Sequence, residues 1–198
     1  MKKIMILFLC VVLLSVSFGC LGESEIQSVE ERSQDDSEVP YETQPEPEPA
    51  QKGTYQNPAN MDETITITSL GDTFRFSVDD VIRGQQANSM ALGANMFNDE
   101  PSSGYEYAFV KVEVNFRDGE SSKYMSTFDF KGYSQGVELT SPFLVFPDQL
   151  KEFSSGNVMP GATKDGWIVF TVPQNEEVII SYYPNLLSSN GGYISIGN

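Results

Sequence analysis

A strict alternation of apolar and polar residues is the feature that most constrains what this chain can fold into. In YAFVKVEVNF at 107–116, Ala108, Val110, Val112, Val114 and Phe116 occupy every second position. Successive side chains of a strand point to opposite sides of the sheet, so these residues share one face. Polar and charged residues at 111–117 fall on the other face. The pattern predicts a long strand with one face in a core and the other in water.

Similar period-two runs recur along the chain, and turn signals rich in Gly, Pro and Asn separate them. The further runs lie at 64–68, 73–78, 127–130, 166–172 and 177–183. No stretch of this region shows a convincing helical period. The runs together predict one all-β domain over residues 61–198, an antiparallel β-sandwich of about seven or eight strands.

The segment 85–104 interrupts this regularity, because it has no strand pattern and is long for a connection inside one domain. It carries Met90, Leu92, Met96 and Phe97, apolar residues that a fully solvated loop would not need. One interpretation is a short helical turn that caps one end of the sandwich. The other is a binding loop.

The first residues, MKKIMILFLCVVLLSVSFGCLG, have the order of a secretory signal: two lysines, an apolar run and small residues. We expect a signal peptide at 1–19 with cleavage between Gly19 and Cys20. Three outcomes are open: lipidation of the Cys20 thiol before cleavage, ordinary cleavage with free secretion, or an uncleaved membrane anchor. Each of them places the domain on the outer side of the membrane.

Cysteine usage favours the first outcome. Cys10 would be lost with the leader, which leaves Cys20 as the sole cysteine and excludes an intramolecular disulfide. Gly19 and Cys20 also match the end of a prokaryotic lipoprotein box. A diacylglycerol on Cys20 with acyl chains such as palmitate would hold the protein firmly, since each buried CH2 contributes about 0.8 kcal/mol.

Residues 20–60 are predicted to be an acidic linker, rich in Pro and Glu, that stays disordered because it has too few apolar residues to bury. The linker would act either as a tether or as a plain spacer. The net charge of the whole chain is -16. A protein this acidic is repelled by nucleic acid and by anionic lipid headgroups. We therefore expect it to contact the cell membrane only through the N-terminal lipid.

The residues available for catalysis are few. The chain has no histidine, and Cys20 is the only cysteine beyond the leader, which excludes the usual triads, thiol catalysis and cysteine zinc sites. Asp99 and Glu100 could offer oxygen atoms to Ca2+, but their spacing is not that of an EF-hand loop. We therefore expect no enzyme, no cofactor and no metal site, and we take Met96, Phe97, Asp99 and Glu100 as candidate binding residues.

The aromatic residues have two interpretations, a stacking platform for a sugar or peptide and an ordinary core. The core interpretation is preferred, because a sandwich without disulfides needs large apolar side chains. If any of the set is exposed, Tyr182 and Tyr183 are the better candidates, because neighbours on a strand face opposite ways. The set comprises Phe128, Phe130, Tyr133, Phe143, Phe146, Phe153, Trp167, Phe170, Tyr182 and Tyr183.

Four motifs follow one another in a recognisable order. They read LGDTFRFSV at 70–78, YEYAFVKVEVNFRDGE at 105–120, TFDFKGYSQGVEL at 127–139 and MPGATKDGWIVFTVPQNEEVIISYYP at 159–184. This order resembles an uncharacterised immunoglobulin-like domain family of prokaryotic lipoproteins. The resemblance implies an immunoglobulin-like β-sandwich outside the cell membrane, similar in fold to small secreted immunogenic proteins, with no established activity or catalytic residue to carry over.

Several motif residues have mechanical roles. Pro160 and Gly161 are expected to turn the chain, Gly166 to let a strand start close to a neighbour, and Pro173 to end that strand by removing a hydrogen-bond donor. These residues determine the fold and do not indicate which ligand is bound.

The sequence thus predicts a membrane-anchored lipoprotein of the cell surface with a non-catalytic immunoglobulin-like domain. That domain is expected to bind an extracytoplasmic protein or another envelope component. One alternative is a module that binds a small ligand or Ca2+. Another is a hydrolase that uses paired carboxylates.

Overall fold

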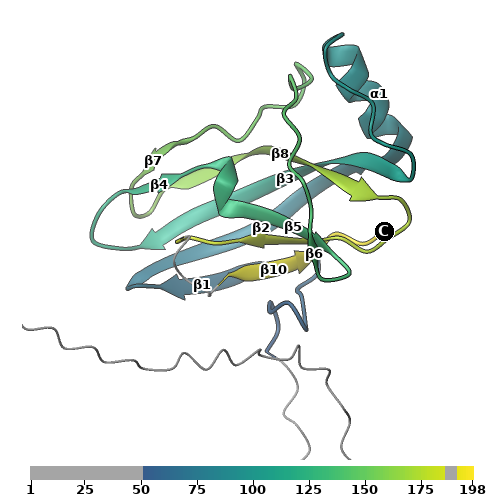
Figure 1. Ribbon diagram of the computed structural model, residues 1–198. Coiled ribbons are helices and arrows are strands. Elements are labelled where there is room, and N and C mark those ends of the chain that lie inside the picture. The colour runs from purple at the N-terminus through teal and green to yellow at the C-terminus, as the bar shows by residue number, and fades with distance from the viewer. Residues whose placement is uncertain (1–50, 186–190) are drawn as a thin grey trace, which may run out of the picture. The chain divides into compact units, whose positions relative to one another are not determined.

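The predicted antiparallel β-sandwich is confirmed by the computed structural model, which describes residues 51–185 and 191–198 (Figure 1). One four-stranded sheet has the order β1-β2-β3-β8, a second has the order β10-β9-β5-β6, and β4 and β7 form a two-stranded sheet. The strands are β1 (Ile65–Ser69), β2 (Asp72–Arg83), β3 (Tyr105–Asp118), β4 (Lys123–Met125), β5 (Phe130–Ser134), β6 (Val137–Glu138), β7 (Gly156–Val158), β8 (Thr163–Pro173), β9 (Ile179–Tyr182) and β10 (Gly192–Ser195). The described ranges therefore hold ten strands instead of seven or eight.

The predicted core face of β3 is buried throughout. Val110, Val112, Val114 and Phe116 are fully shielded from solvent. They pack in one hydrophobic cluster with inward-facing residues of the opposite sheet, among them Ile180. The alternation in the sequence thus identifies the strand and its inner face correctly, because burial in a sandwich follows the period of the strand.

The prediction of water on the whole other face of β3 is wrong for its first half. Tyr107 and Phe109 lie on that outer face and are buried in a second cluster with Trp167 and Val169 of β8. A helix and a loop cover this part of the sheet, which a strand pattern does not reveal. From Lys111 onward the outer face is half-exposed, as expected.

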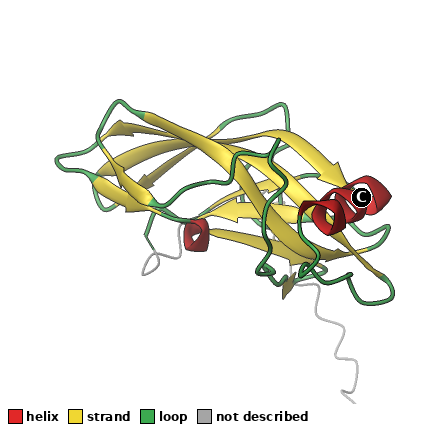
Figure 2. Ribbon diagram, turned by 90° about the horizontal axis from the view of Figure 1, so that it is seen from above, coloured by secondary structure: helices red, strands yellow, loops and turns green. Residues whose placement is uncertain are grey.

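The cover of this cluster includes α1 (Gly84–Ala94), at one end of the sandwich (Figure 2). The sequence predicts either a short helical turn at the end of the sandwich or a binding loop here, and the structure has a helix of 11 residues although the sequence shows no convincing helical period. Its buried residues are small, Ala87 and Ala91, so the helix approaches the sheet closely without a marked apolar stripe. The Asn88 side chain also accepts a hydrogen bond from the Tyr107 N–H at 2.8 Å.

The strand predicted at 127–130 is also wrong, because Thr127–Asp129 form a single 3-10 turn, η1, and β5 begins only at Phe130. Ser126 and Asp129 cap this turn reciprocally, and the Asp129 carboxylate accepts a hydrogen bond from the Ser126 N–H at 2.7 Å. Polar side chains that bond to nearby backbone compete with strand pairing. As a result, the Phe128 side chain points outward.

The segment 51–60, which the sequence analysis places in the linker, lies against the second sheet. Ala59 pairs in parallel with Ile194 of β10, and the Tyr55 ring contacts Tyr133 and Tyr193 edge-on at 5.9 Å. Ordered structure therefore starts before residue 61. The described residues do not include the predicted signal peptide, Gly19, Cys20 or most of the linker. Among the residues that are described, no helix is long and apolar enough to cross a membrane.

The roles predicted for Pro160, Gly161 and Pro173 are confirmed, and Gly166 permits a close approach as predicted, but its strand starts three residues earlier, at Thr163. Gly161 has φ +87° in the turn before β8, and β8 ends at Pro173. A Cβ at Gly166 would lie 2.5 Å from the Phe153 Cα atom, so only glycine lets these two backbones approach.

Candidate functional site

The site begins with β8, the outermost strand of its sheet. The segment 139–153 runs beside its free edge but pairs with it at only two points. Thr140 pairs antiparallel with Thr171, and Glu152 pairs in parallel with Trp167. Between these points the segment bulges away from the strand, so the middle of the β8 edge, residues 168–170, is left without a neighbouring strand.

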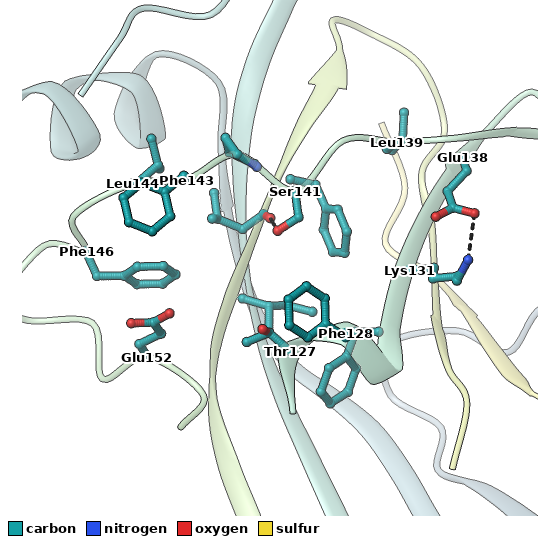
Figure 3. A pocket seen from close by; sticks show the side chains of 15 residues that line it. Thr127, Phe128, Lys131, Glu138, Leu139, Ser141, Phe143, Leu144, Phe146 and Glu152 are labelled. Carbon is teal, nitrogen blue, oxygen red and sulfur yellow. Dashed lines mark hydrogen bonds and ion pairs between the residues drawn. The ribbon is translucent and has the colours of Figure 1, made fainter. Parts of the chain in front are cut away.

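A groove of about 740 Å3 lies under this bulge, between the β8 edge and the opposite sheet (Figure 3). Its lining is mostly aromatic and aliphatic, with a few polar groups, which is the composition of small-ligand and peptide sites in general. The lining residues are Thr127, Phe128, Phe130, Lys131, Glu138, Leu139, Ser141, Pro142, Phe143, Leu144, Phe146, Glu152, Ile168, Val169 and Phe170.

Charged groups stand at two opposite ends of the groove (Figure 3). At one end Lys131 forms an ion pair with Glu138 at 2.8 Å, and this hydrogen bond raises the pKa of the lysine. At the other end lies the exposed Glu152. The carboxylates in the lining therefore do not sit together as a catalytic pair.

Two phenylalanines of the lining are almost wholly exposed, Phe128 at 79% and Phe143 at 103%. The prediction that the aromatic set forms the core is wrong for both. Phe128 sits on the η1 turn, and Phe143 follows Pro142, so neither belongs to a strand with a buried face. Tyr182, expected among the more exposed residues, is 1% exposed and packs inside the core.

The remaining aromatic residues of the predicted core are buried or half-buried. Phe130, Phe153, Trp167 and Phe170 are buried, as expected. Phe146, Tyr133 and Tyr183 are half-buried. Phe146 packs edge-on against Phe109 of the second cluster with ring centroids 5.5 Å apart, so it anchors the bulge to the sheet.

The predicted binding residues Met96, Phe97, Asp99 and Glu100 lie in the loop after α1 and are all exposed, outside the groove lining. Met96 and Phe97 are 86% and 83% exposed. Glu100 borders a second, smaller hollow of about 350 Å3. No group of three or more acidic, His or Cys side chains suited to a metal ion occurs within 51–185 and 191–198.

The loop is nevertheless connected to the groove through Asn98, which is buried. Its side-chain amide donates to the Ala91 carbonyl at 2.7 Å and to the Val145 carbonyl at 2.8 Å, and its oxygen accepts from the Val145 N–H at 2.9 Å. Asn98 thereby holds the bulge at 141–151 in place. The sequence analysis missed the groove, although the run SPFLVF at 141–146 has apolar residues without strand alternation.

Comparison with known proteins now identifies the family. The family model described as a domain of unknown function, DUF4352, matches residues 60–192. The chain belongs to the DUF4352 family. The match covers β1 to β9, the first residue of β10 and every groove residue, and it confirms the resemblance to an uncharacterised domain family.

Solved structures share the fold of this DUF4352 domain. The ycdA protein of Bacillus subtilis, a proposed lipoprotein, aligns with TM-score 0.53 and 13% identity over 70% of this chain and 39% of its own. The yjhA protein of the same species aligns with TM-score 0.51 and 18% identity over 69% of this chain and 97% of its own. The secreted protein MPT63 of Mycobacterium tuberculosis aligns with TM-score 0.48 and 13% identity over 71% of this chain and 95% of its own.

The chain thus spans about two fifths of ycdA, and nearly all of yjhA is matched. No curated protein is significantly similar in sequence to the chain. At these identities the first two matches support the sandwich fold alone, so no residue of the groove inherits a role from them.

Proposed function

We propose that this DUF4352 domain is a non-catalytic binding module that works outside the cell membrane and holds a partner protein in the groove beside β8. The observation that carries the proposal is the groove itself, with Phe128 and Phe143 exposed at its mouth. Exposed aromatic side chains grouped at a concave site mark contact surfaces, because their hydration is unfavourable without a partner.

The extracytoplasmic location rests on the predicted leader and is supported by ycdA, a proposed lipoprotein that shares the fold. Cys20 carries the lipid in this proposal, and the acidic linker spaces the domain from the bilayer. Replacement of Cys20 by serine should move the protein from the membrane fraction to the soluble fraction. Retention of Cys20→Ser in the membrane would instead indicate an uncleaved anchor.

A non-catalytic role fits the chemistry of the groove. The chain has no histidine, and the lining contains only two carboxylates, Glu138 and Glu152, one of which is bound by Lys131. The ion pair with Glu138 raises the pKa of Lys131 and keeps its amine protonated, so this lysine offers no nucleophile or general base.

The test is site-specific photocrosslinking of the full chain in intact cells. A photoreactive residue replaces Phe128 or Phe143 at the mouth of the groove. The matched control replaces Met159, which is 63% exposed and does not line the groove. Protein adducts from positions 128 and 143 but not from 159 are expected. Equal adducts from all three positions, or none, would contradict a groove that binds protein.

A small apolar ligand is the second candidate, since the groove volume of about 740 Å3 falls in the range of ligand sites. Native mass spectrometry of protein purified from its own membranes separates the two. A non-covalent small molecule that disappears in a Phe143→Ala variant would favour this second candidate over a protein partner.

A further inference from the structure

The edge of β8 has an unfilled hydrogen-bonding position at Val169. Trp167, Val169 and Thr171 point their backbone groups the same way, because the direction alternates with a period of two. Trp167 donates to the Lys151 carbonyl and accepts from the Phe153 N–H, both at 2.9 Å. Thr171 donates to the Thr140 carbonyl at 2.9 Å. Val169 lies between them and faces the groove.

Pro142 explains why the chain does not fill this position itself. If the antiparallel pairing of Thr140 with Thr171 continued for two more residues, Pro142 would lie opposite Val169. Proline has no N–H to donate and cannot complete a ladder pair. The Ser141 hydroxyl instead donates to the Val169 carbonyl at 3.1 Å.

The Val169 N–H makes no hydrogen bond to any residue within 51–185 and 191–198, although Val169 is only 3% exposed. Buried backbone donors are rarely left without an acceptor, because losing water there costs about 1–3 kcal/mol. The position is therefore suited to an acceptor supplied by another molecule.

We propose that the groove takes an extended peptide segment of the partner, which adds as a short strand beside β8. This inference rests on the proposed function and specifies how the partner is recognised. The Val169 N–H donates to a carbonyl of the peptide, and a peptide N–H replaces the Ser141 hydroxyl on the Val169 carbonyl. In strand addition such backbone bonds provide affinity, and pockets for alternate side chains provide specificity.

The groove also specifies the side chains of the segment. Alternate residues of an extended peptide point one way, so those facing inward meet Phe130, Ile168 and Phe170, and the peptide must be apolar at these positions. The exposed Phe128 and Phe143 close over it from the mouth.

Charge selects the residues that flank this apolar part. Glu152 lies at one end of the groove, and Glu138, with Lys131, lies at the other. The domain from residue 61 onward carries 18 acidic and 8 basic residues, counted from the sequence. Such a surface attracts a cationic segment and repels an acidic one. The partner segment is therefore apolar at its centre and has lysine or arginine on both sides.

The test uses the chain from residue 20 onward, made soluble by Cys20→Ser, with pooled blocked pentapeptides. The pool has lysine at both ends and apolar residues at the three central positions. A second pool is identical except that its central residue is N-methylated, which removes the N–H and blocks pairing. A third pool has glutamate at both ends. Binding is followed by fluorescence of Trp167, the only tryptophan of the chain, and by amide exchange at Val169.

We expect the lysine pool to bind at least tenfold more tightly than either other pool and to slow amide exchange at Val169. Phe143→Ala should weaken this binding, whereas Phe97→Ala, at another highly exposed site outside the groove, should not. Equal binding of the plain and N-methylated pools would overturn strand addition while leaving a groove that binds protein. Failure of every pool to bind, with crosslinks still formed from position 143, would overturn the extended-peptide inference alone.

Discussion

Replacement of Gly166 by alanine tests how the groove is built. Gly166 lies at the place where the end of the bulge returns to β8. A Cβ there would lie 2.5 Å from the Cα atom and 2.7 Å from the nitrogen of Phe153. These are backbone atoms, so the clash is relieved only by moving the whole segment away from the strand.

The expected loss of stability follows from what this movement breaks. The segment makes two backbone hydrogen bonds with Trp167, and each contributes about 1 kcal/mol. Phe153 is 1% exposed and packs edge-on against Phe130 at 4.9 Å, so a shift also disturbs the core. Overpacking of this kind costs about 1–3 kcal/mol. We expect Gly166→Ala to lower the free energy of unfolding by about 2–4 kcal/mol, which corresponds to roughly 4–16 °C in Tm.

Urea unfolding at pH 7, followed by far-UV circular dichroism, gives the free energy directly. Gly93→Ala is the matched control, because no atom lies within 4 Å of the added Cβ and the residue is in α1. An alanine in a helix is favoured over glycine by about 0.5–1 kcal/mol, so this variant should be slightly more stable than the wild type. A Gly166→Ala variant within 0.5 kcal/mol of the wild type, on the scale of ordinary surface changes, would refute the close approach of the two backbones.

Three further predictions concern polar groups. Arg83→Ala should cost about 1–3 kcal/mol in unfolding free energy, because it leaves the half-buried Glu106 carboxylate, 2.7 Å away, without its partner, whereas Glu106→Gln should cost less. Asn98→Ala should cost about 1–3 kcal/mol in the same assay, because both backbone groups of Val145 lose their partner. Burial raises the pKa of Asp129 above its ordinary 3.8, so the folded state holds this proton more tightly than the unfolded chain. The stabilisation by this bound proton is therefore complete below the unfolded pKa and is lost as pH rises through the folded pKa. Asp129→Asn should flatten that part of a curve of unfolding free energy measured against pH.

The strand pattern could be predicted because it depends on local order. The runs expected from alternation overlap β1, β2, β3, β8 and β9, and the inner face of β3 is correctly assigned. The family motifs were equally visible, since Gly166 and Gly161 are required by backbone approach and by a positive φ. Alternation and glycine placement reflect the geometry of a single strand or turn.

The errors have two causes, local capping within one turn and contact between segments far apart in the sequence. The run at 127–130 alternates like a strand but forms η1, because Ser126 and Asp129 bond to the local backbone. The full extent of the helix α1 was not predicted because its buried residues are alanines, whose contribution depends on the sheet that they touch. The exposure of Phe128 and Phe143 was likewise set by their neighbours and not by their hydrophobicity.

The sequence by itself determined that this chain folds as a β-sandwich, is poor in catalytic side chains and is strongly acidic. Only the tertiary structure decided where a partner could bind. The groove exists because residues 140 and 152 pair with one edge strand while the chain between them bulges away. Pro142 and Val169 lie 27 positions apart in sequence. Continued pairing of Thr140 with Thr171 would place Pro142 opposite Val169, and this relation depends on strand packing, which no local pattern encodes.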